Sequence, residues 1–165
     1  MSEKLDYKKA YKELYLPPAH PHLIEVPDML FIAVDGQGDP NTSPAYQHAV
    51  EVLYGLSYAI KMSKMDGSQP EGYHEYTVFP LEGLWSLSNL DDISATYEIK
   101  DKSGFLWTSM IRQPAFVTQA AFEQARDKLA KKKPGLDLSA ARLMRYHEGL
   151  CVQMMHTGPY DAEPA

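Results

Sequence analysis

The pattern of apolar and polar positions predicts two helices. The first begins after Ser43, a residue type that caps helices, and has Pro44 at its first position. Apolar residues then recur three or four positions apart until Asp66-Gly67 ends the pattern. This recurring set is Tyr46, Val50, Leu53, Leu56 and Ile60. A second helix is predicted from a Thr118 cap through Lys133, with one apolar face.

Strand-like patterns fill much of the remaining chain. The continuously apolar run 29–34 indicates a buried strand. Segments 76–87 and 95–111 alternate and are rich in aromatic residues, so we expect them to pair antiparallel through a turn at residues 89–92. A final strand pair is expected at 142–146 and 150–155, joined by a short turn.

A weak internal repeat suggests how the elements are grouped. Residues 23–32 align without a gap on residues 143–152, each with an apolar strand and an acidic turn residue. The division that we expect within one domain is an N-terminal arm (1–20), a first repeat (21–114), a linker helix (115–135) and the start of a second repeat (142–165).

The repeat also leads to an expectation about the end of the chain. In the first copy a helix and two strands follow, and the matching elements would come after Ala165. Without them the apolar face of 150–155 is expected to be uncovered and the fold less stable, unless a homodimer covers that face.

The N-terminal arm contains three tyrosines spaced four residues apart, Tyr7, Tyr11 and Tyr15, followed by two prolines. This spacing predicts a short helix that packs its tyrosines on the body of the protein and ends at the prolines.

Composition excludes several classes of partner. The 165 residues fit one domain, and a net charge of −6 argues against binding to nucleic acid, which needs clustered cations. The basic run 131–133 is expected to complement the dipole at the end of its helix. One cysteine, Cys151, excludes an internal disulfide. The sequence shows neither a membrane span nor a leader, so we expect a cytoplasmic protein.

Five ordered segments carry a family resemblance: 35–41, 49–55, 80–85, 110–114 and 156–161. They resemble the GyrI-like small-molecule-binding family. The resemblance implies an α+β fold, a duplicated strand-helix-strand-strand unit forming antiparallel sheet with helices on one side. It also implies a ligand, typically a xenobiotic, in the groove where the halves meet. The family's pocket glutamate belongs to a strand that would follow Ala165.

Within that family, the Pro-Leu-Glu-Gly-Leu-Trp stretch ending at Trp85 and the tryptophan at 107 are similar to stand-alone cyclopropanoid cyclopropyl hydrolases. Those proteins hold DNA-alkylating compounds in an aromatic cage and open the strained ring with water. The resemblance implies Trp85 and Trp107 as cage walls, with Tyr54, Tyr58 and Met110 beside them.

Reasoning from the residues leaves alternatives open. Tyr54 and Tyr58 share one helix face, which is typical of core packing as well as of a pocket. The two tryptophans fit either environment equally. Glu82 should face away from Trp85 unless Gly83 marks a bulge. A carboxyl beside indole rings would have a raised pKa and suit a general acid, and the alternative is a solvated glutamate.

Other chemistries lack their motifs. The histidines show no metal-ligand spacing, the glycines at 36 and 38 lack a third partner for a dinucleotide loop, and no Gly-x-Ser-x-Gly elbow occurs. We therefore expect no metal and no cofactor. The hypotheses are a hydrolase acting on cyclopropane-bearing alkylators, a non-enzymatic module that sequesters or senses such compounds, and a topoisomerase-inhibitor-like protein.

Overall fold

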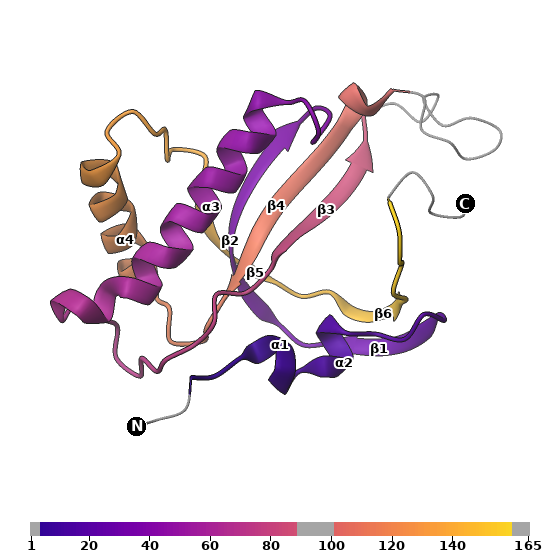
Figure 1. The fold of residues 1–165 in the computed structure, drawn as a ribbon, viewed down its shortest axis with the longest axis horizontal. Helices are drawn as coiled ribbons and strands as arrows, with labels where there is room; N and C mark the ends of the chain where they lie inside the picture. Colours follow the sequence, from indigo (N-terminus) through magenta and orange to yellow (C-terminus); the bar gives the residue numbers. More distant parts are fainter. Residues whose placement is uncertain (1–3, 89–100, 160–165) are drawn as a thin grey trace.

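A computed structural model describes residues 4–88 and 101–159. The fold is α+β, as predicted, with two antiparallel sheets (Figure 1). The four-stranded sheet has the order β3-β4-β2-β5, and β1 and β6 form a separate two-stranded ribbon. The strands are β1 (His22–Val26), β2 (Met29–Gln37), β3 (Leu81–Leu87), β4 (Phe105–Gln113), β5 (Arg142–Tyr146) and β6 (Gly149–Gln153). The helices are α1 (Tyr7–Ala10), α2 (Lys12–Tyr15), α3 (Pro44–Met62) and α4 (Gln119–Lys132), with 3-10 turns η1 (Ser63–Asp66) and η3 (Lys102–Gly104).

Both long helices begin at the predicted caps. The Ser43 hydroxyl accepts a hydrogen bond from the Tyr46 amide, and the Thr118 hydroxyl accepts one from the Ala121 amide. The first helical stretch ends through η1 at Gly67, whose φ of 74° is the left-handed conformation that glycine adopts at little cost. None of the helices within 4–88 and 101–159 is long and apolar enough to cross a bilayer.

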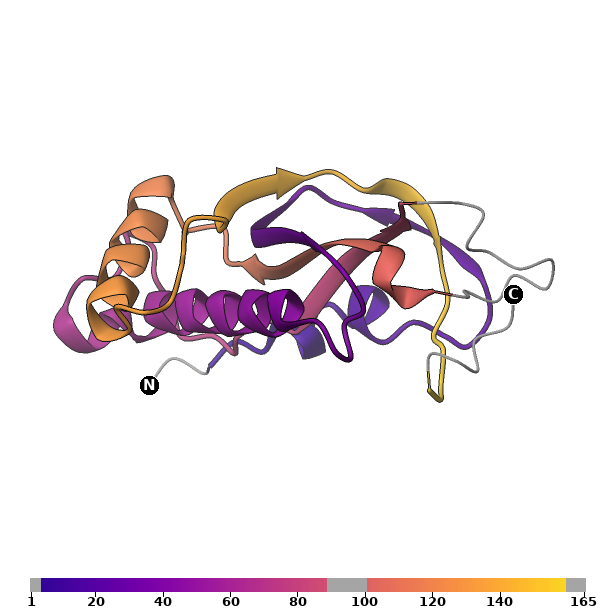
Figure 2. The same ribbon diagram turned by 90° about the horizontal axis from the view of Figure 1, so that it is seen from above.

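The helix α3 packs on one face of the four-stranded sheet, and α4 packs against α3 (Figure 2). Leu53, Leu56 and Ile60 of α3 pack there with Ile32 and Ile111 of the sheet, all at most 2% exposed. Burial of each such side chain stabilises the fold by about 1.5 to 3 kcal/mol. This layer is the main core, and we call this side of the sheet the helix face.

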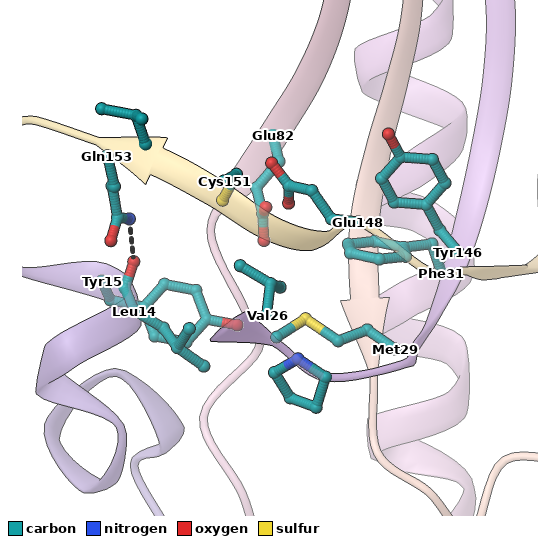
Figure 3. A pocket seen from close by; sticks show the side chains of 12 residues that line it. Leu14, Tyr15, Val26, Met29, Phe31, Glu82, Tyr146, Glu148, Cys151 and Gln153 are labelled. Atoms are coloured by element: carbon teal, nitrogen blue, oxygen red, sulfur yellow. Dashed lines mark hydrogen bonds between the residues drawn. The ribbon is translucent and has the colours of Figure 1, made fainter. Parts of the chain in front are cut away.

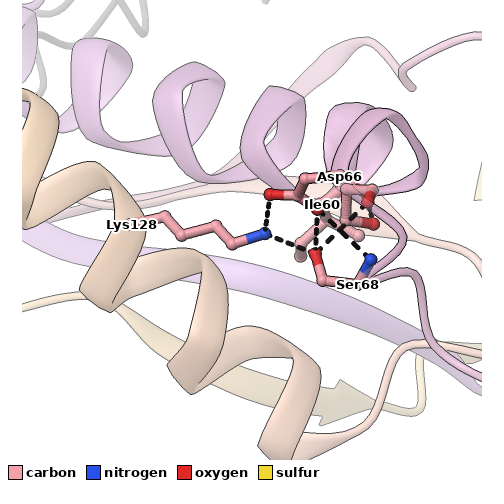
Figure 4. Close-up of polar contacts among 5 residues, drawn as sticks. Ile60, Asp66, Ser68 and Lys128 are labelled. Carbon is pink, nitrogen blue, oxygen red and sulfur yellow. Dashed lines mark hydrogen bonds and ion pairs between the residues drawn. The ribbon is translucent and has the colours of Figure 1, made fainter.

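A polar cluster joins α4 to the end of α3 (Figure 4). The Lys128 ammonium is 2.6 Å from the Asp66 carboxylate and also contacts the Ser68 hydroxyl. Hydrogen bonds from Lys128 and Ser68 lower the pKa of Asp66 to about 2. These groups are well exposed, so their interactions add little to the free energy of unfolding. Their contribution is to fix the position of α4 relative to the end of α3.

The opposite face of the sheet is covered by the β1-β6 ribbon and the N-terminal arm. A second core lies between them, built from Val26, Met29, Phe31, Ala33 and Met110. We call this side of the sheet the ribbon face. The chain crosses from ribbon to sheet at residues 27–28, and from sheet back to ribbon at residues 147–148.

The expected pairing of the last two strands is wrong. β5 pairs with β2 and β6 pairs with β1, so neither of the last strands is the other's neighbour. The connection is only His147-Glu148, and Gly149 follows with a φ of 72°. This corner turns the chain out of the plane of the sheet, whereas a hairpin would keep both strands in one sheet.

The boundaries of the middle strands also differ from the prediction. β3 and β4 pair antiparallel as expected, but β3 begins only at Leu81, after Pro80. Tyr76 makes an isolated bridge with Leu5 of the arm and is buried there. η3 precedes β4, and the predicted turn at 89–92 lies outside the described residues.

The arm folds as two short helices instead of one. Tyr7 is buried, with its ring 4.5 Å from that of Phe79, and its hydroxyl is 2.7 Å from the His74 ring nitrogen. Tyr15 also packs against the main core, while Tyr11 is 39% exposed. Tyr7 and Tyr15 thus pack in or against the main core, and Tyr11 contacts the body through the guanidinium of Arg112.

Candidate functional site

A cavity of about 110 Å³ lies between the ribbon, the arm and the ribbon face of the sheet (Figure 3). Eight of its twelve lining residues are apolar or aromatic, and the polar groups include two carboxyls, a thiol and two phenols. The lining residues are Leu14, Tyr15, Val26, Pro27, Met29, Phe31, Glu82, Tyr146, Glu148, Cys151, Val152 and Gln153.

Glu82 reaches this cavity because of its register in the sheet. It pairs with Met110 in an unbroken β3-β4 ladder, which places both side chains on the ribbon face. Gly83 therefore marks no bulge, and the alternation argument gave the correct face for Glu82.

The Glu82 carboxyl is held in an environment that disfavours its charge. Its Oε1 atom is buried and has no hydrogen-bond partner. Burial is the main cause that raises the pKa of Glu82 to about 7; the charge of Arg112 opposes this shift, and Glu148 makes a smaller contribution that raises the pKa. Near neutral pH this carboxyl is therefore protonated in a substantial fraction of molecules and can act as a proton donor.

Tyr15 extends from the end of α2 and is fixed by a cation. Arg112 Nη1 donates a hydrogen bond of 3.0 Å to the Tyr15 hydroxyl oxygen. The guanidinium lies 4.9 Å from the Phe79 ring centroid and 5.4 Å from that of Tyr11. Burial raises the pKa of Tyr15, and the hydrogen bond from Arg112 partly offsets that effect.

The corner after β5 supplies the second carboxyl. Glu148 is exposed, and its interactions contribute to raised pKa values at Glu82 and Cys151. For the Cys151 thiol, desolvation is the larger cause. A thiol with a raised pKa is protonated at neutral pH, so Cys151 is poorly suited to nucleophilic attack.

The tryptophans lie on the helix face, opposite Glu82. Trp107 is 3% exposed, and its ring centroid is 5.1 Å from that of Tyr46 on α3. Trp85 is 45% exposed and lies beside Tyr46 and Phe105, with ring centroids 5.8 and 5.6 Å away. Trp85 and Trp107 are directly cross-strand neighbours.

Of the remaining predicted ligand contacts, two lie on α3 and one lies on the ribbon face of the sheet. Tyr54 and Tyr58 are on the outer side of α3, 36% and 49% exposed. Met110 is buried in the second core, on the same face as Glu82. The structure thus brings Met110 and Glu82 together, while the two tryptophans, Tyr54 and Tyr58 lie elsewhere, and their role in ligand binding stays a prediction.

Sequence reasoning missed most of the cavity wall, notably Tyr15, Phe31, Tyr146 and Glu148. The internal repeat did contain a signal for Glu148, because it aligns Asp28 with Glu148 at equivalent turns. In the structure these two turns are the corners between the ribbon and the sheet. Among the described residues no group of three or more His, Cys, Asp or Glu side chains is placed to hold a metal ion.

Comparison with known proteins finds close relatives among solved structures. An uncharacterized conserved protein from Listeria innocua is 46% identical with a TM-score of 0.86, over 95% of this chain and 74% of that one. A hydrolase from the same organism is 45% identical with a TM-score of 0.85, over 97% and 75% of the two chains. A further Listeria innocua structure, also described as a hydrolase, is 44% identical with a TM-score of 0.84, over 96% and 74%.

The chain belongs to the family of these Listeria innocua proteins. Two of the three relatives are described as hydrolases, so the family relation is to hydrolase-like proteins. No family model and no curated protein matches the chain.

Proposed function

We propose that the protein is a hydrolase whose reaction takes place in the cavity between the ribbon and the sheet. The observation that carries the proposal is the buried Glu82 carboxyl, with an unpartnered Oε1 and a pKa of about 7. Perturbed carboxyls in cavities are candidates for acid-base catalysis. The description of two close relatives as hydrolases supports the same reaction class.

The cavity favours a particular kind of substrate. Its volume of about 110 Å³ is well below the ~300 Å³ or more of a site that encloses a drug-sized ligand. It would therefore take the reactive end of a larger molecule. The lining contains no Lys or Arg and two carboxyls, which disfavours anionic groups. A neutral, planar aromatic electrophile fits these walls.

The substrate class that we propose is a compound with a cyclopropane ring conjugated to a ketone, as the resemblance to GyrI-like cyclopropanoid hydrolases implies. Glu82 would protonate the ketone oxygen while water attacks a ring CH₂ carbon. The breaking C–C bond supplies the electron pair that converts the dienone into a phenol. The attacking water then loses a proton, which restores the acid, so the product is a single molecule that carries both a phenol and a primary alcohol.

The test is turnover of a spiro-cyclopropyl cyclohexadienone fused to an aromatic ring, by unaltered protein and by Glu82→Gln. Loss of the acid should lower kcat by ~100-fold or more, with binding largely retained. Glu25→Gln is the matched control, since Glu25 is an exposed ribbon residue outside the cavity, and should keep full activity.

Two results would contradict the proposal. Full turnover by Glu82→Gln would remove Glu82 from the chemistry. Tight binding of the probe without any product from unaltered protein would exclude hydrolysis of this substrate class and leave sequestration as the function.

Sequestration is the second candidate, and the half-exposed Trp85 favours it. Together with Tyr46 and Phe105 it forms an aromatic surface on the helix face. Such a surface is suited to stacking on a planar ligand without any reaction. In this alternative Trp85 would be the ligand wall that the family resemblance implies, and the 3% exposed Trp107 would support it as its cross-strand neighbour.

A further inference from the structure

We propose that Tyr15 is a second catalytic residue of the Glu82 cavity and that Arg112 is its positioning residue. The Tyr15 hydroxyl would donate a hydrogen bond to the substrate oxygen that gains electron density when the ring opens. This inference rests on the proposed hydrolase function and adds a second group to it.

Several contacts fix Tyr15 at the cavity wall. Its ring packs against the main core, 6.1 Å from the Phe79 ring centroid. The preceding residue is tied to the ribbon, because Gln153 Nε2 donates a hydrogen bond of 2.7 Å to the Leu14 carbonyl. Just beyond α2, the Met155 amide donates to the Pro18 carbonyl at 2.9 Å. Figure 3 shows the Tyr15 hydroxyl pointing into the space below Glu82.

The hydrogen bond with Arg112 determines where the hydroxyl proton can go. A guanidinium has donors and no acceptor, so the Tyr15 oxygen must accept from Arg112. The proton of Tyr15 is therefore left for another acceptor. Within residues 4–88 and 101–159 no protein acceptor is hydrogen-bonded to it. A substrate oxygen in the cavity would supply the missing acceptor.

Arg112 itself is held away from the substrate. It is absent from the cavity wall, and its guanidinium lies over the rings of Phe79 and Tyr11. Its positive charge strengthens Tyr15 as a donor, because charge that develops on the substrate oxygen is partly shared through the phenol. Burial keeps the pKa of Tyr15 above its ordinary value, so the phenol is protonated at neutral pH and available to donate.

This arrangement also narrows the substrate class. Glu82 and Tyr15 are both proton-bearing groups near neutral pH, and both would be satisfied by one carbonyl oxygen. A substrate that lacks this oxygen leaves two partly buried donors unpaired, which costs free energy. The cavity should therefore select cyclopropanes conjugated to a ketone over cyclopropanes of similar shape without one.

The test compares Tyr15→Phe with unaltered protein on the fused spiro-cyclopropyl dienone. The ring is kept and only the donor is lost, so kcat should fall by roughly 100-fold while KM stays within about twofold. The control is Tyr73→Phe, which also removes a hydrogen-bonded hydroxyl, since Tyr73 donates to the Lys61 carbonyl far from the cavity. It should leave kcat unchanged.

Because Arg112 is proposed to act through Tyr15, Arg112→Gln should lower kcat when Tyr15 is present and cause no further loss of kcat in Tyr15→Phe. The same variant tests the electrostatic effect of Arg112 on Glu82. Arg112 lowers the pKa of Glu82, so its removal should shift the alkaline limb of the kcat profile to higher pH. Tyr15→Phe should lower kcat across the profile without that shift. Thermal melting of each variant confirms that it is folded.

The outcomes separate this inference from the proposed function. Normal kcat for Tyr15→Phe together with an inactive Glu82→Gln overturns the role of Tyr15 and keeps the hydrolase. Normal kcat for Glu82→Gln, or no turnover by unaltered protein, overturns both.

Discussion

Glu82 shows how a single side chain is shaped by the face of the sheet on which it lies. Alternation along β3 directs it toward the ribbon, where apolar groups from two sheets and the arm remove it from water. The sequence argument placed Glu82 beside the indole rings only if Gly83 formed a bulge, and otherwise left a solvated glutamate as the alternative. The indoles are on the other face, and the groups that share the cavity with Glu82 come from the ribbon, the arm, the start of β2 and the end of β5.

The raised pKa of Glu82 has a consequence for stability. Its ordinary value is 4.5 and the folded value is about 7, so the folded state binds the proton more tightly than the unfolded state. The resulting stabilisation is fully present below pH ~4.5 and is lost as pH rises through 7. Relative to Glu82→Gln, unaltered protein should lose roughly 2 to 3 kcal/mol between pH 5 and pH 8.

Urea unfolding of both proteins at the two pH values measures this difference. Every other titrating group is common to the pair, so its contribution cancels. Parallel changes in the two free energies of unfolding would show that the Glu82 carboxyl is solvated.

At the scale of the elements, the Trp107 ring of β4 can lie over β2 because Gly36 has no side chain. A Cβ at this position would lie 2.2 Å from Cη2 of Trp107, and that ring is confined by Tyr46 of α3. Gly36→Ala should therefore destabilise the fold by about 1 to 3 kcal/mol.

Gly135→Ala is the control for this substitution, because nothing lies within 4 Å of a Cβ built there. Its free energy of unfolding should stay close to that of unaltered protein. Equal stability of Gly36→Ala and Gly135→Ala would mean that Trp107 can move aside at no cost.

Elements defined by local signals were predicted well from the sequence. The caps at Ser43 and Thr118 and the stop at Gly67 fixed both long helices to within a few residues. The pairing of β5 and β6 was predicted wrongly, because a short turn between apolar strands is typical of a hairpin. The residues His147-Glu148-Gly149 alone do not indicate that the chain turns out of the sheet. The turn forms because β5 pairs with β2 and β6 pairs with β1, and these partners come from a distant part of the chain.

At the scale of the whole molecule, the four-stranded sheet separates two aromatic regions that are adjacent in the sequence. Glu82 and Trp85 are three residues apart and face opposite sides. The cavity is completed by residues from both ends of the chain, Tyr15 and Glu148 among them. Motifs within one segment could indicate Glu82, but only the folded arrangement brings these distant residues to it.

This separation predicts the effect of Trp85→Ala. If the substrate reacts in the Glu82 cavity, kcat for the dienone probe should stay within about twofold of the unaltered value, because substitutions on opposite faces act independently. Steady-state kinetics and equilibrium binding of the probe provide the measurement.

A different result would favour the aromatic surface on the helix face. Trp85 would be shown to stack on the ligand if probe binding weakened by ~0.5 to 1.5 kcal/mol more than the loss of contact area accounts for. Met65→Ala serves as the control, since this 73% exposed side chain lies in η1, beyond the C-terminal end of α3.

The ribbon and the four-stranded sheet are joined by two corners, and both corners lie along one line between them. Residues 27–28 and 147–148 form that line, and the Asp28 carboxyl contacts the His147 ring across it. Rotation about this line would move Val26, Cys151 and Val152 together relative to Glu82. The helix side of the sheet would keep its packing. A change of one residue in a corner is therefore expected to alter the width of the cavity while the main core keeps its packing.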